Sequence, residues 1–78
     1  MAGVNPPSGA GSDTLDGLTD RQIQVLRLLG RGLTDAEIAG ELFVSPRTVH
    51  AHLRTIYRKL HVSHRSAATR LAIQNGLT

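Results

Sequence analysis

The stretch of residues 45–60, SPRTVHAHLRTIYRKL, combines cationic and hydrogen-bonding side chains and contains no acid. It holds three arginines, one lysine and two histidines. A surface helix of a soluble protein usually mixes both signs of charge on its polar face. A one-signed face favours binding of a polyanion, because guanidinium and ammonium groups pair with phosphate oxygens and arginine can also bond the edge of a guanine base.

The distribution of charge along the chain points the same way. The first 41 residues carry three basic and six acidic side chains, a net charge of −3, whereas the remaining 37 carry six basic side chains and no acid. We therefore expect the C-terminal half to meet a polyanionic partner. A solvated basic face would produce the same asymmetry, so both interpretations stay open at this point.

Other kinds of chemistry find little support in the residue types. His50 and His52 would point about 200° apart on one helix and so could not share a metal ion. His61 and His64 lack the carboxylate or thiolate support of a zinc site. There is no cysteine, and neither a Ser-His-acid set nor a phosphate-binding glycine loop is present. We therefore predict no enzyme activity, no metal, no cofactor and no small-molecule ligand.

The apolar residues contain no long uninterrupted run. A membrane-spanning helix needs about 20 consecutive apolar residues, and no segment approaches this length. The N-terminus also lacks the apolar segment of a signal peptide. From these two observations we expect a cytoplasmic protein with no membrane contact.

The residues that could do chemistry must be positioned by helices, whose starts are marked by capping signals. Thr19 and Thr34 each open a capping box, and Ser45 precedes a proline at a first helical position. Ser63 is the predicted cap of a fourth helix. Apolar residues at helical spacing follow each signal, and no strand pattern appears. In the third helix, the predicted buried stripe consists of Val49, Leu53, Ile56 and Leu60. The sequence therefore predicts an all-α, four-helix fold with helices at about residues 20–31, 35–42, 46–60 and 64–75.

Residues 1–17 differ in composition from the rest of the chain. They are rich in Gly, Pro, Ser and Asp and show no periodic apolar pattern. Such a composition is typical of a disordered tail or a linker. We therefore expect one folded domain, over residues 18–78.

The second and third predicted helices lie very close together in the sequence. Only Phe43 and Val44 separate the second helix from Ser45, the cap of the third. A short helix, a tight connection and a longer basic helix form the helix-turn-helix arrangement, in which the first helix braces the second in the DNA major groove. Phe43 stands where glycine is usual, and helical hairpins that bind nothing share the pattern.

Three segments together narrow this interpretation: LT-x-R at residues 18–21, GLT-x-x-EIA at residues 32–39, and S-x-x-TV-x-x-HL at residues 45–53. They resemble the LuxR-type (GerE-like) DNA-binding domain of bacterial transcription regulators, and the resemblance covers about residues 18–77. It implies a four-helix domain that binds double-stranded DNA through its third helix and commonly pairs through its fourth. This chain departs from the family in Gln22, where Glu is usual, and in His50, where Lys or Arg is frequent.

The resemblance also suggests roles for individual side chains of the third helix. His50, Ala51 and Arg54 match the base-contacting positions: Arg can bond guanine, Ala can touch a thymine methyl, and neutral His can make one bond. The flanking side chains could position the helix through a charge or a hydroxyl on the phosphates. These predicted phosphate contacts are Arg47, Thr48, His52, Arg58 and Lys59.

On the fourth helix, Thr69 and Ile73 lie outside the arc of apolar residues. The resemblance makes this face the predicted dimer contact. The patch is small, so we expect a weak homodimer that forms mainly on DNA carrying two half-sites about 10 base pairs apart.

Two alternatives remain beside duplex DNA binding. The chain could be a helical protein-interaction module whose basic face meets an acidic partner. RNA binding is disfavoured, because readers of single strands need aromatic stacking platforms and the chain offers only Phe43 and Tyr57.

Overall fold

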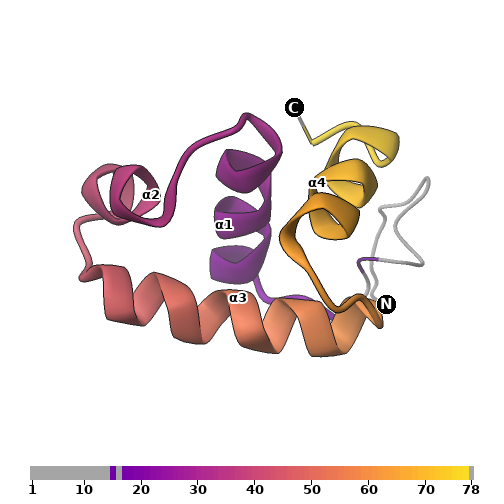
Figure 1. Ribbon diagram of the computed structural model, residues 1–78, viewed down its shortest axis with the longest axis horizontal. Helices are drawn as coiled ribbons and strands as arrows, with labels where there is room; N and C mark the ends of the chain where they lie inside the picture. Colours follow the sequence, from indigo (N-terminus) through magenta and orange to yellow (C-terminus); the bar gives the residue numbers. More distant parts are fainter. Residues whose placement is uncertain (1–14, 16, 78) are drawn as a thin grey trace, which may run out of the picture.

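The computed structural model describes residues 15 and 17–77, and these form four helices without a strand (Figure 1). The helices are α1 (Asp20–Gly30), α2 (Asp35–Leu42), α3 (Pro46–Leu60) and α4 (Arg65–Gln74). The predicted all-α, four-helix fold is confirmed. The bounds of α2 and α3 agree with the prediction, whereas α1 ends one residue early and α4 is one residue shorter at each end.

Side chains close the starts of the first three helices as predicted. Thr19 Oγ1 accepts the backbone N–H of Gln22 at 3.1 Å, and Gln22 Oε1 accepts the N–H of Thr19 at 2.9 Å. Thr34 and Glu37 exchange the same pair of bonds at 3.1 and 2.8 Å. At α3, Ser45 Oγ accepts the N–H of Thr48 at 3.1 Å. These bonds satisfy N–H groups that have no partner inside a helix.

The predicted cap of α4 was wrong by one residue. His64, not Ser63, is the N-cap, and its Nδ1 accepts the N–H of Ala67 at 3.4 Å and lies 3.0 Å from Ser66 Oγ. Because α4 begins at Arg65, Ser63 lies one position too early to reach the free N–H groups of the first turn. A histidine is an unusual cap, so the sequence signal at Ser63 was the more obvious one.

Residues with left-handed backbone follow the helices, and some of them are glycine whereas others are not. Gly32 has φ +92° after α1, and the N–H of Leu33 donates to the carbonyl of Leu28 at 3.3 Å. Phe43 and His61 end α2 and α3 at φ 58°, a conformation that costs a non-glycine residue energy. The bond from the N–H of Val44 to the carbonyl of Ala39, 3.1 Å long, helps to hold the turn where glycine was expected.

The core is aliphatic and joins all four helices. In Figure 1, α3 runs along one side of the molecule, α1 stands across it, and α2 and α4 lie to either side of α1. The four apolar residues predicted as the buried stripe of α3 are all buried. The core consists of Leu15, Val25, Leu26, Leu29, Ile38, Ala39, Val49, Leu53, Ile56, Leu60, Ala68 and Ala72.

Packing begins earlier in the chain than the boundary expected at residue 18. Leu15 is 7% exposed and belongs to the core, and its carbonyl accepts the N–H of Leu18 at 3.0 Å. The folded part therefore includes Leu15. The rest of the predicted tail, apart from Gly17, lies outside the described residues.

The start of α1 is tied to the end of α3 by one lysine. Lys59 Nζ donates to Gln22 Oε1 at 3.0 Å and to the carbonyl of Gly17 at 2.8 Å. Gln22 is buried and shares its oxygen between this bond and its own capping box. A neutral amide thus accepts a hydrogen bond from an ammonium group.

Gln22→Glu is therefore expected to stabilise the domain. A carboxylate would keep both bonds and add a charge-assisted contact with Lys59, an effect of about 0.5 kcal/mol once exposure of the lysine is considered. The melting temperature should rise by about 2–4 °C in thermal unfolding followed by circular dichroism. Gln24→Glu, which makes the same charge change on an exposed position of α1, should leave it nearly unchanged. Equal effects of the two substitutions would exclude the Lys59 contact as the cause.

Candidate nucleic-acid interface

The exposed face of α3 gathers the polar side chains that the apolar stripe turns away from the core. Val49, Leu53, Ile56 and Leu60 are buried, so the opposite side of the helix faces solvent. A shallow hollow on that side is lined by Arg47, His50, Ala51, Arg54, Thr55 and Arg58. No acid takes part in this lining, which we call the arginine face.

All three predicted base-contacting residues lie on the arginine face. His50, Ala51 and Arg54 are exposed, so each could meet a ligand without a change in the fold. Thr55 also lines the hollow, half-buried, although no role was predicted for it. Its spacing of four residues from Ala51 is the signal that could have identified it, since i and i+4 positions lie on one face of a helix.

The predicted phosphate contacts are distributed over a wider surface. Arg47 and Arg58 lie on the arginine face. Thr48 and His52 are half-buried outside its lining, and Thr48 Oγ1 lies 3.0 Å from Ser45 Oγ at the start of α3. Lys59 is placed elsewhere, with two protons of its ammonium group bonded toward α1. One proton of that group remains for a phosphate.

The arginine face carries uncompensated positive charge. Among the described residues, the recorded ion pair joins Arg65 to Asp35 at 2.7 Å, and it lies on α4 and α2. Arg47, Arg54 and Arg58 are thus not paired with an acid in the part of the chain that the structure describes. Three unpaired guanidinium groups along one helix create a positive potential that attracts an extended polyanion.

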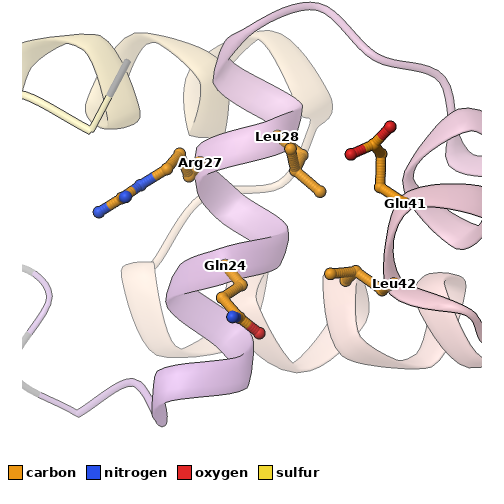
Figure 2. Close-up of a pocket in the computed structure, with 5 residues that line it drawn as sticks. All are labelled: Gln24, Arg27, Leu28, Glu41 and Leu42. Carbon is orange, nitrogen blue, oxygen red and sulfur yellow. The ribbon is translucent and has the colours of Figure 1, made fainter.

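A second hollow lies between α1 and α2, and its chemistry differs. Figure 2 shows Leu28 and Leu42 along it, with the polar side chains of Gln24, Arg27 and Glu41 around them. The side chain of Arg27 points away from Glu41 in this view. With one cation and one anion, this hollow has no net charge to hold a polyanion.

No group of three or more His, Cys, Asp or Glu side chains comes close enough to hold a metal ion within residues 15 and 17–77. None of the four helices in this part of the chain is long and apolar enough to cross a membrane.

The comparison with known protein families agrees with this geometry. The sequence model of the family described as "Bacterial regulatory proteins, luxR family" matches residues 16–72, which include α1, α2, α3 and most of α4. This chain belongs to the LuxR family of bacterial regulatory proteins. Its α2 and α3 are the helix-turn-helix of a LuxR-type DNA-binding domain, the type found in transcription regulators.

Individual members of the LuxR family are similar over the same region. A nitrate/nitrite response regulator protein homolog of Haemophilus influenzae is 51% identical over 55 residues, which are 70% of this chain and 26% of that protein. The nitrate/nitrite response regulator protein NarP of Escherichia coli is 44% identical over 66 residues, 85% of this chain and 31% of NarP. This LuxR-type chain therefore spans about a third or less of these relatives.

A solved structure shows the same fold. The crystal structure of the response regulator ChrA, described as part of a heme-sensing two-component system, superposes with a TM-score of 0.70 at 38% sequence identity. The match covers 94% of this LuxR-type chain and 33% of the ChrA chain.

Proposed function

We propose that this chain binds duplex DNA sequence-specifically, with α3 in the major groove, and that it is the DNA-binding part of a bacterial transcription regulator. The observation that carries the proposal is the arginine face, which holds three arginines on the exposed side of the second helix of a helix-turn-helix, none of them paired with an acid among the described residues. An α-helix fits the width of the major groove, and α2 braces α3 through the shared core. The named relatives are response regulators, which supports control of transcription under a signal.

Within this proposal the residues of α3 have different tasks. Arg54 would grip a guanine through O6 and N7, Ala51 would touch a thymine methyl, and His50 would make one bond to a base edge. Phosphate contacts would come from the side chains around them and would position the helix without reading sequence. These are Arg47, Thr48, His52, Arg58 and Lys59.

The experiment that tests the function is a selection from random duplexes at low salt, followed by binding measurements on the selected sequence. We expect enrichment of one short motif and much tighter binding to it than to unrelated duplex DNA. An acidic protein partner is the alternative, since the arginine face would attract it too. Equal binding to heparin, acidic polypeptide and every duplex would favour that alternative and contradict sequence-specific recognition.

We also propose that two copies pair through α4 on DNA. Ile73 is 57% exposed, and a mainly apolar hollow lies one to two turns earlier, lined by His64, Arg65, Ser66 and Thr69. If two α4 helices cross antiparallel at Thr69, Ile73 of each copy lies opposite the hollow of the other. Such a contact repeats itself under a two-fold axis, as an isologous interface requires.

Ile73→Glu is expected to abolish cooperative binding to a duplex with two half-sites about 10 base pairs apart. The substitution replaces an apolar side chain by a carboxylate, whose removal from water on pairing costs free energy, whereas binding to one half-site would be unaffected. Band-shift titrations on single and double sites measure both quantities. Gln74→Glu makes the same charge change on the neighbouring exposed residue and should preserve cooperativity. Cooperativity that survives Ile73→Glu would place the pairing surface elsewhere.

A further inference from the structure

Arg65 links three helices through polar contacts that lie outside the apolar core. The main packing of α4 is against α1, and it has few contacts with α2 or α3. Arg65 is the first residue of α4, and its guanidinium group donates to Asp35 Oδ1 at 2.7 Å and to the carbonyl of Leu33 at 2.6 Å. Asp35 is the first residue of α2, and Leu33 lies two residues before it. The forked guanidinium group thus binds two separate groups of one helix start.

Tyr57 of α3 lies beside the same contact. Burial raises the pKa of Tyr57 above its usual 10.0, the charge of Arg65 lowers it in part, and the charge of Asp35 raises it. The hydroxyl therefore responds to both partners of the ion pair. Because Tyr57 is the single tyrosine of the chain, its titration can be followed without the signal of another tyrosine.

The exposure of the pair indicates what it contributes. The side chains of Arg65 and Asp35 are 42% and 34% exposed, and ion pairs so open to water add little to stability. Their geometry, in contrast, is specific, since two acceptors and one fork define where the start of α2 lies. The larger effect of the contact is thus expected in the position of α2, the helix that braces α3, rather than in the free energy of unfolding.

We propose that Arg65 is a positioning residue for the recognition helix: it holds the start of α2 against α4 and Tyr57, and so sets the orientation in which α3 meets DNA. This inference rests on the proposed duplex binding. Arg65 itself is engaged within the domain, so it acts through α2 and α3 and not as a contact to DNA.

Two substitutions that change the net charge of the domain in opposite directions distinguish positioning from simple electrostatics. Arg65→Met removes a positive charge, whereas Asp35→Asn removes a negative one, which by charge alone would strengthen binding to DNA. Under the positioning role, both should weaken affinity for a selected single half-site by about fivefold or more, with melting temperatures close to wild type. The effects of the two substitutions should not add in the double variant, because Arg65 and Asp35 are partners in one contact.

Two further variants complete the design. Arg70→Met, on an exposed position of the same helix, makes the charge change of Arg65→Met and should alter affinity by less than about twofold. Arg65→Lys keeps the charge but not the fork, and should still weaken binding. In the absorbance titration, Arg65→Met should raise the midpoint of Tyr57 and Asp35→Asn should lower it.

Two results would overturn the inference. Tighter or unchanged binding by Asp35→Asn, with Arg65→Met no weaker than Arg70→Met, would show that Arg65 is only one more positive charge. Loss of affinity in proportion to loss of melting temperature would reduce its role to stability. A wild-type chain that binds no duplex would instead contradict the proposed function itself, so the two failures are distinguishable.

Discussion

A fourfold rise in salt, from 50 to 200 mM, is expected to weaken duplex binding by roughly 40-fold. Each neutralised phosphate releases condensed counterions and adds about −0.9 to the slope of log affinity against log salt. The three permanent cations among the predicted phosphate contacts, Arg47, Arg58 and Lys59, give a slope of about −2.7. Fluorescence anisotropy with a labelled duplex at several salt concentrations measures this slope.

The salt slope should become smaller when a cation of the arginine face is removed, and it should stay the same when another cation of the chain is removed. Arg58→Ala should reduce its magnitude by about 1, because one phosphate contact is lost. Arg31→Ala is the matched control, since Arg31 follows α1 at the end of the helix that is remote from α3 (Figure 1). An affinity that does not depend on salt would contradict the placement of α3 in the groove.

Arg54→Ala should cost about 1–3 kcal/mol on the preferred site and relax the choice of base at one position. The expected loss is large because a guanidinium group that bonds both O6 and N7 of a guanine has no equivalent in alanine. Competition titrations with a set of duplexes, each changed at one base pair, measure the affinity and the position of the relaxed preference together.

The neighbouring cations provide the comparison. Arg58 lies one turn beyond Arg54 on the same face, and Arg58→Ala should weaken binding to every sequence alike. Lys59→Ala should have the same effect on binding. It should also reduce the stability of the domain, because the bonds of Lys59 to Gly17 and Gln22 disappear. A uniform loss across all sequences for Arg54→Ala would reassign Arg54 to a phosphate.

The helices and the arginine face follow from local sequence. Capping boxes at Thr19 and Thr34 depend on side chains three residues apart, and the apolar stripe of α3 depends on helical periodicity. Both are short-range, so the bounds of α2 and α3 and the set of buried α3 residues were predicted correctly. Once the buried stripe is known, the opposite face is determined by geometry, and His50, Ala51 and Arg54 indeed lie there together.

Features that depend on distant residues were decided by the tertiary structure. Arg65 meets Asp35 and Leu33 some thirty residues earlier, and Lys59 meets Gln22 and Gly17 from the far end of α3. No local pattern marks such pairs, because they form only after the core has brought the helices together. The same reason explains Leu15, whose burial depends on a surface that other helices create. Local sequence thus determined which side chains face solvent, and packing decided which of them remained free to meet a partner.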